Sequence, residues 1–156
     1  MEFRAYPAGQ MFMLRGEQPI KSRSAISFYV GYNRTDRKDY GEHDNEEGGG
    51  FGGGLGYKKY VKQDSSGFYV GLENFIWKLD IDWKEPVSGA FSFSGTTEIL
   101  VLQPAFNFGY KHVPESRKWY AELGFAFGAE INVKTIGSEV GQGGISMITA
   151  SFGFSL

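Results

Sequence analysis

The residues best suited to chemistry lie in the charged segment 36–47, where carboxylates surround His43. Carboxylate oxygens and an imidazole nitrogen can ligate a cation. The spacing of these carboxylates is not that of an EF-hand loop, and no second histidine or cysteine stands nearby to complete a zinc site. We therefore expect a solvated, charged loop without a metal.

A nucleophilic site would need a histidine beside a serine and an acid. The chain has only two histidines, His43 and His112. His43 and Asp44 could combine with Ser92 or Ser94 from another loop, whereas the neighbours of His112 form no His-x-Ser element. Because nothing beyond composition supports such a site, we expect no catalytic residue and no cofactor-binding residue.

The glycine run 48–56 superficially resembles a phosphate-binding loop. It lacks the Lys-Ser/Thr ending of such loops, and no helix is predicted after it to present an anion-binding N-terminus. We expect instead a strand whose glycines fit a crowded interior.

The clearest structural element in the sequence is the segment 119–134, in which apolar residues alternate with small or polar ones. Its odd positions from Trp119 to Val133 are all apolar, and its even positions include Glu122, Glu130 and Lys134. A strict period of two over this length predicts a long β-strand and not a helix.

The same alternation predicts further strands over 10–18, 25–34, 50–61, 75–83, 98–112 and 145–156. The short segment 2–6, set off by Pro7-Ala8-Gly9, supplies an eighth strand. Upstream of Glu73-Asn74 the apolar residues change parity to Phe68, Val70 and Leu72, which predicts a β-bulge there. Pro104 lies on the apolar face of a strong strand; we expect a tolerated bulge, and a weakened seam that admits lipid is the alternative.

Two alternating classes of connection join these strands. Short links lie near 62–66 and 114–118, and longer ones span 35–49, 84–96 and 135–142. Short turns at one end and long loops at the other are typical of outer-membrane barrels. The whole chain, 1–156, is therefore predicted to be a single all-β domain: an eight-stranded antiparallel up-and-down transmembrane β-barrel.

The composition of the two faces decides which of them points outward. The polar face is rich in Gly, Ala, Ser and Asn, which suit a narrow interior. The other face carries aromatic residues near strand ends, as in an interfacial girdle: Trp77, Trp83, Trp119, Tyr32, Tyr57 and Tyr110. Charges placed inside should form a polar network that closes the interior to solutes: Lys78, Asp80, Asp82, Glu122, Glu130 and Lys134.

Three stretches resemble small, uncharacterised outer-membrane β-barrel proteins of Bacteroidetes: 41–57, Leu102-Gln103-Pro104 and 128–134. More loosely, the chain is similar to the small-barrel group that includes the OmpA and OmpX types. Its last residues, Phe152-Gly-Phe-Ser-Leu156, resemble the signal read by the barrel-assembly machinery, with Leu in place of the usual final Phe. The resemblance implies fold and location, and no known activity.

We therefore expect a non-enzymatic outer-membrane protein with a structural or adhesion role and no open pore. Its partners would be outer-membrane lipid, the barrel-assembly machinery and an extracellular ligand at loops 35–49 and 84–96, where Phe91 and Phe93 could anchor a partner or dip into headgroups. A soluble lipocalin-like barrel and a lipid-modifying enzyme are the alternatives.

With a net charge of −2 and no basic stripe, no nucleic-acid partner is expected. Because the chain starts directly in strand-like sequence, we expect a mature form with an added Met.

Overall fold

The structure is a computed structural model that describes residues 1–38, 42–86 and 92–154. Within these ranges the chain forms β-strands and turns, and no helix long and apolar enough to cross a membrane is present. The strands are β1 (Glu2–Tyr6), β2 (Gly9–Lys21), β3 (Ser24–Lys38), β4 (Asn45–Tyr60), β5 (Gly67–Pro86), β6 (Ser92–His112), β7 (Trp119–Ile136) and β8 (Gly143–Phe154).

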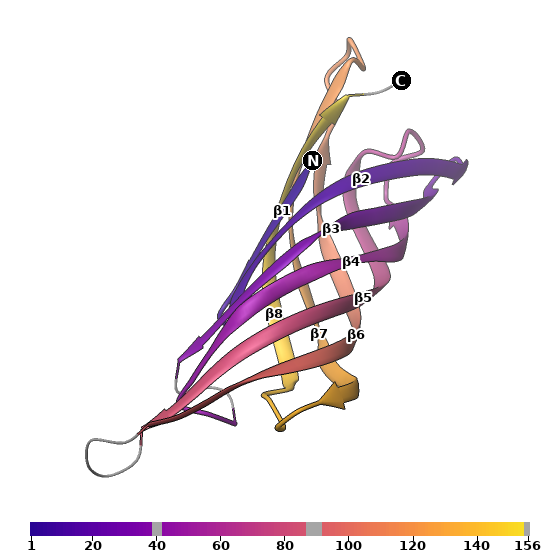
Figure 1. Cartoon of the computed structure of the whole chain (residues 1–156). Coiled ribbons are helices and arrows are strands. Elements are labelled where there is room, and N and C mark those ends of the chain that lie inside the picture. Colours follow the sequence, from indigo (N-terminus) through magenta and orange to yellow (C-terminus); the bar gives the residue numbers. More distant parts are fainter. Residues whose placement is uncertain (39–41, 87–91, 155–156) are drawn as a thin grey trace.

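Each strand pairs antiparallel with its sequence neighbours, and β1 pairs with β8 to close a ring (Figure 1). The closing seam is the shortest of the ring, since it runs only from Glu2↔Ser151 to Ala5↔Ile148. The pairing of β5 with β6 is the longest, from Gly67↔Lys111 to Pro86↔Ser92. The prediction of eight antiparallel strands, with a short first strand at 2–6, is confirmed.

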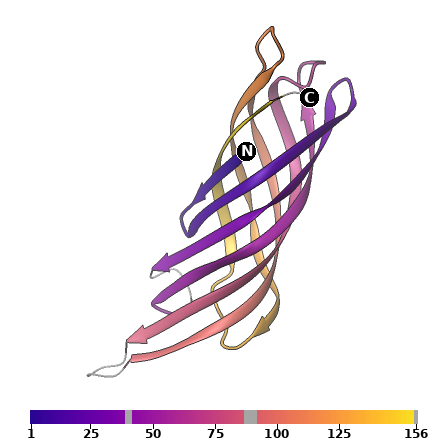
Figure 2. The ribbon, with the colours of Figure 1, turned by 45° about the horizontal axis from the view of Figure 1, so that its top comes forward.

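The two ends of the ring differ. β1 begins and β8 ends toward one end, which we call the terminal end, and strands β5 and β6 extend beyond their neighbours at the other, the loop end (Figures 1 and 2). Strands continue through the flanks of the predicted loops 35–49 and 84–96, so that only 39–44 and 87–91 lie between strands. Charged residues on these strand extensions made the loops look longer in the sequence. Residues 39–41 and 87–91, Phe91 among them, fall outside the described residues.

The β-bulge predicted at Glu73-Asn74 is wrong. β5 pairs with β4 and β6 without interruption, and register shifts occur instead between Pro19 and Lys21 and between Leu100 and Val101. What changes near Glu73 is the environment of the two faces. Before Glu73 the apolar residues of β5 point outward: Phe68, Val70 and Leu72. After Glu73 large apolar residues point inward: Phe75, Trp77, Leu79 and Ile81.

The polarity of the ring therefore inverts along its length. Toward the terminal end the interior is charged and the outer face is apolar. Toward the loop end the interior is an apolar core, which includes Met11, Trp77, Leu79, Ile99, Val101 and Met147. The outer face becomes charged there on part of the ring: along β3 the outward residues pass from Phe28, Val30 and Tyr32 to Arg34, Asp36 and Lys38. On β7 it stays apolar, with Ile131, Val133 and Ile136 exposed.

This inversion corrects several predicted side-chain positions. Trp77 and Trp83 point inward and not toward an outer girdle, while Tyr32, Tyr57 and Tyr110 are exposed on the outer face as predicted. Lys78, Asp80, Asp82 and Lys134 are exposed, so they do not contribute to the interior network. Glu122 and Glu130 are buried inside, as predicted.

Candidate functional site

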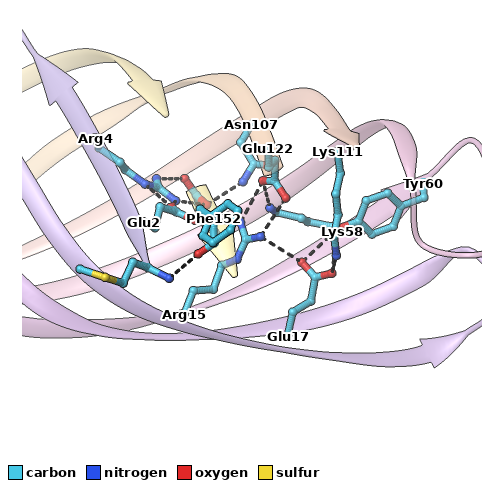
Figure 3. A network of polar contacts seen from close by, with 12 residues as sticks. Glu2, Arg4, Arg15, Glu17, Lys58, Tyr60, Asn107, Lys111, Glu122 and Phe152 are labelled. Atoms are coloured by element: carbon cyan, nitrogen blue, oxygen red, sulfur yellow. Dashed lines mark hydrogen bonds and ion pairs between the residues drawn. The ribbon is translucent and has the colours of Figure 1, made fainter. Parts of the chain in front are cut away.

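The interior of the terminal half holds a network of buried ion pairs that joins strands far apart in the ring (Figure 3). In its first part, the Arg4 guanidinium of β1 donates to Glu2, with Nε 2.7 Å from Oε1, and to Glu73 of β5, with Nη2 2.9 Å from Oε2. Asn107 of β6 donates from Nδ2 to the same Glu73 oxygen at 2.6 Å. Because β1, β5 and β6 are not all neighbours, these bonds cross the interior.

The second part of the network centres on Glu122 of β7. Its two carboxylate oxygens each accept from an Nη atom of Arg15 at 2.9 Å, and it also accepts from the Lys58 ammonium of β4. Arg15 donates as well to Glu2 Oε2 at 2.8 Å, which joins the two parts. Nearer the terminal end, Lys111 Nζ lies 2.5 Å from Glu17 Oε1, and Tyr60 donates to both Glu17 oxygens at 3.0 Å.

The charges of this network balance. Four cations, Arg4, Arg15, Lys58 and Lys111, face four anions, Glu2, Glu17, Glu73 and Glu122. Buried charges are tolerated when they are paired and hydrogen-bonded, as these are. These side chains lie across the terminal half of the interior, and cations also lie over aromatic rings, with Lys58 Nζ 4.4 Å from the Tyr69 centroid.

The sequence predicted an interior polar network but assigned most of its members wrongly. Of the eight charged residues, only Glu122 was among those expected. The others could have been found from strand parity. Lys58, for example, has the same parity as Gly52, Gly54 and Gly56, which alternation places on the inner face of β4.

A second buried charge cluster lies nearer the loop end and consists of Arg37 of β3, Glu46 of β4 and Glu130 of β7. Arg37 donates from Nη1 to Glu46 Oε2 at 3.1 Å and from Nη2 to Glu130 Oε2 at 2.7 Å. Glu46 also accepts backbone N–H groups from Glu42 at 2.9 Å and from Gly141 at 3.1 Å. Glu130 Oε1 is buried and has no hydrogen-bond partner among the described residues.

His43 packs against an aromatic ring and assembles no catalytic or metal site with the described residues. Its ring stacks on Trp83, with centroids 4.1 Å apart and planes 12° from parallel. Neither ring nitrogen has a hydrogen-bond partner in the described part of the chain, so Ser92 and Ser94 do not reach it. No group of three metal-ligating side chains occurs there either. His112 lies at the terminal end beside Trp119.

The glycine run of β4 is a packing surface for inward aromatic rings. A Cβ on Gly52 would lie 2.4 Å from the Trp77 ring, and one on Gly54 would lie 2.5 Å from the Phe75 ring. Trp77 is held there by a hydrogen bond from Nε1 to Gln103 Oε1 at 2.8 Å. The run is thus a strand in a crowded interior, as predicted, with no helix after it.

The bulge predicted at Pro104 is also wrong, since the β6–β7 register is the same before and after it: Leu102 pairs with Ile131, and Ala105 with Gly128. Pairing is instead interrupted at Gln103 and Pro104, without a shift. The register shift of this seam lies between Leu100 and Val101. The proline therefore removes ladder contacts and leaves the alignment of the strands unchanged.

The concave regions of the described residues include two on the outer surface. An apolar groove of about 810 Å³ crosses the β1–β8 seam, and Phe3, Phe12, Leu14 and Phe152 contribute to its walls. A polar groove of about 670 Å³ lies toward the loop end, with side chains of both charges on its walls: Arg34, Glu47, Asp80, Asp82 and Lys84. Phe93, predicted to be accessible, is 66% exposed.

No protein family, curated protein or solved structure matches the chain. The molecule offers a closed ring, an interior crossed by paired charges, and an outer face that is apolar over the terminal half and charged over part of the loop end.

Proposed function

We propose that the chain is a bacterial outer-membrane β-barrel with a closed interior and a structural or adhesion role. The observation that carries this proposal is the inversion of polarity along the strands. A membrane-spanning barrel needs an apolar outer band, with polar groups inside or beyond the band. The terminal half of the ring has this arrangement, and its charged extension at the loop end suits headgroups and water.

The size of the apolar outer band supports the membrane location. Soluble monomers rarely expose a contiguous apolar patch larger than a few hundred Å². Here large apolar side chains are exposed on every strand, among them Phe3, Phe12, Phe28, Phe51, Phe68, Phe108, Phe125 and Phe152. A closed ring also satisfies its backbone hydrogen bonds internally, which the hydrocarbon region requires.

The proposed partners follow from this location. Outer-membrane lipid contacts the apolar band, and the barrel-assembly machinery reads the C-terminal segment, of which Ser155 and Leu156 fall outside the described residues. Loops 35–49 and 84–96 form the surface offered to an extracellular ligand. The resemblance to small outer-membrane barrels of Bacteroidetes and to the OmpA and OmpX types agrees with this assignment.

A soluble lipocalin-like barrel is supported less well. Such a protein would turn its apolar face inward around a ligand, whereas an apolar groove of about 810 Å³ lies on the outside and the terminal half of the interior holds buried ion pairs. A lipid-modifying enzyme has no favouring observation, since neither ring nitrogen of His43 hydrogen-bonds to a described hydroxyl group.

The first experiment compares gel mobility of unboiled and boiled protein folded in detergent, together with solubility after detergent withdrawal. A heat-modifiable band and precipitation on withdrawal are expected. A stable, soluble monomer in buffer would overturn the proposal.

A matched pair of outward substitutions tests where the membrane lies. Phe108→Lys puts a cation in the apolar band of β6, and Asp80→Lys puts one on the charged extension of β5. A cation near the bilayer midplane costs about 2–4 kcal/mol, and one near the interface about 0–1 kcal/mol. We expect Phe108→Lys to reduce the fraction folded into liposomes strongly and Asp80→Lys to leave it unchanged; equal yields would contradict the assignment.

A further inference from the structure

The two buried charge clusters differ in net charge. The network of the terminal half pairs four cations with four anions, whereas Arg37, Glu46 and Glu130 sum to −1. Glu46 is well satisfied, because it accepts from Arg37 and from backbone N–H groups. The unbalanced charge is thus left on Glu130, whose side chain is 7% exposed and whose Oε1 has no partner among the described residues.

A cavity of about 190 Å³ opens beside Glu130, in the wall of the ring. It exists because β1 is short. β1 ends at Tyr6 and turns back at Pro7-Ala8, while β8 continues as far as Gly143. On the loop-end side of this turn the wall has a gap, which we call the notch. It is bounded by Tyr6, Pro7, Ala8, Arg37, Glu130 and 141–146.

The edge of β8 adds backbone carbonyl and N–H groups to the notch. The backbone N and O of Phe152 both bond to Met1, so they face β1. Alternation then turns the backbone groups of Ala150, Ile148, Ser146 and Gly144 the same way. Since β1 pairs with β8 only as far as Ile148, the carbonyls and N–H groups of Ser146 and Gly144 face the notch without a β1 partner.

We propose that the notch binds one organic cation: the ammonium or guanidinium head of an aliphatic chain. Its charge lies against Glu130 Oε1 and is also accepted by the carbonyls at the β8 edge. Its chain lies along the apolar side of the notch, formed by Tyr6, Pro7 and Ile145. A charge-assisted hydrogen bond to a buried carboxylate supplies the recognition.

The donor set favours an organic cation over a hard metal ion. Ca²⁺ takes six to eight oxygen ligands, several of them usually carboxylates. Here Glu130 offers a single free oxygen, and the Arg37 guanidinium lies 2.7 Å from the other. No cluster of three metal-ligating side chains is present in the ranges that the structure describes.

The same cation could come from a free amine or from a lysine or arginine side chain of a partner peptide. A peptide could in addition hydrogen-bond along the free edge of β8, as in β-strand addition. The proposal does not depend on membrane insertion, because the buried side chains of Arg37 and Glu130 line the notch from the interior of the ring. If the notch binds no cation, the proposed outer-membrane function still stands. If the protein is not a membrane protein, the notch can still bind a cation.

The experiment titrates folded protein in detergent with n-butylammonium by calorimetry and with n-butanol as the neutral control. We expect saturable binding of the amine alone. Glu130→Gln should weaken it at least about tenfold, as expected for loss of a hydrogen bond to a charged group. The matched control Glu98→Gln removes an exposed carboxylate that pairs with Lys78 at 3.1 Å, and should leave binding unchanged.

A second variant covers the case in which Glu130→Gln does not fold. Ala8→Lys, in the turn that bounds the notch, would tether an ammonium beside Glu130 and should abolish binding of added amine. Acetyl-Ala-Lys-Ala-amide binding more tightly than n-butylammonium identifies a basic side chain as the source, and weaker binding identifies a free amine. No binding by the unsubstituted protein, unchanged binding by both variants, or displacement of the amine by equimolar CaCl₂ would overturn the proposal.

Discussion

Arg15 of β2 and Glu122 of β7 form a two-pronged ion pair across the interior of the ring, with both Nη atoms 2.9 Å from carboxylate oxygens. The Arg15 and Glu122 side chains are 0% and 3% exposed. Because Lys58 and Glu2 join the same pair, four strands are tied together at one point. The closing seam between β1 and β8 is short, so much of the cohesion of β1 comes from such cross-ring bonds.

Substitution of Glu122 by Gln should therefore destabilise the fold strongly. The change leaves Arg15 and Lys58 buried with one carboxylate fewer, and breaking a buried ion pair from one side costs about 3–5 kcal/mol. Urea unfolding of the protein in detergent would measure this loss.

Glu98→Gln is the control for that measurement. Glu98 pairs with Lys78 on the outer face, where both side chains are largely exposed, at 43% and 63%. Exposed pairs contribute only about 0–1 kcal/mol. Equal losses in the two variants would show that the interior of the ring is hydrated and open.

The glycines of β4 provide a second test, of the packing toward the loop end. Gly52→Ala places a Cβ 2.4 Å from the Trp77 ring and 2.2 Å from the Ile76 carbonyl oxygen. The backbone oxygen cannot move away easily, so we expect a loss of about 1–3 kcal/mol, as for overpacking in other cores.

Gly16→Ala is the matched substitution, because a Cβ on Gly16 would have no neighbour within 4 Å. It should be neutral or stabilise the protein by up to about 1 kcal/mol through the unfolded chain. Thermal unfolding of both variants would check the pair, and a tolerated Gly52→Ala would contradict the inward position of Trp77.

The sequence predicted the strands well because alternation has a period of two whichever face is buried. The number and order of strands followed from it, including the short strand 2–6. Alternation does not tell which face lies inside. Along β5 the apolar residues change from even to odd positions near Glu73, and this parity change has two explanations: an extra residue or a change of environment.

In the structure the parity change reflects a change of environment, which occurs where β5 leaves the apolar outer band. Alternation therefore predicts the strand around Trp77 and Asp80 correctly but places these two side chains on the wrong faces. The sequence does not predict Arg4 and Lys58 as members of the interior network for a related reason. Each is a single charge in a weakly alternating segment. Their significance comes from partners 69 and 64 residues away in sequence. The notch could not be predicted either, since it arises from unequal strand lengths.

The turn between β4 and β5 carries a pH-dependent contribution to stability. The Ser66 hydroxyl donates to Asp64 at 2.5 Å and, with Arg117 3.6 Å away, holds the pKa of the Asp64 carboxyl below its usual value. A carboxyl whose pKa is lower in the folded state stabilises the fold above its unfolded pKa. That contribution is lost as the pH falls through the folded-state pKa.

Asp64→Asn should thus cost less than about 1 kcal/mol at pH 7, because the group is exposed and screened. The cost should shrink toward zero as the pH falls below the unfolded-state pKa of about 3.9 and through the folded-state value. Unfolding at a series of pH values would follow it. A cost that is independent of pH would mean that the Ser66 hydrogen bond, and not the charge, stabilises the turn.

Pro104 offers the last test, at the seam between β6 and β7. A Cβ on Gly128 would lie 2.2 Å from the Pro104 carbonyl oxygen, so the backbone of Pro104 faces β7, where the proline ring removes one donor. With the register unchanged on both sides, residue 104 lies opposite Ala129.

In the variant Pro104→Val, the backbone N–H of residue 104 would then donate to the Ala129 carbonyl and stabilise the seam by about 0.5–1.5 kcal/mol. Amide hydrogen exchange along 102–105 and 128–131 should slow. If neither exchange nor lipid retention changes, the seam does not open to lipid; if the variant is less stable, the proline ring itself is needed for packing at this position.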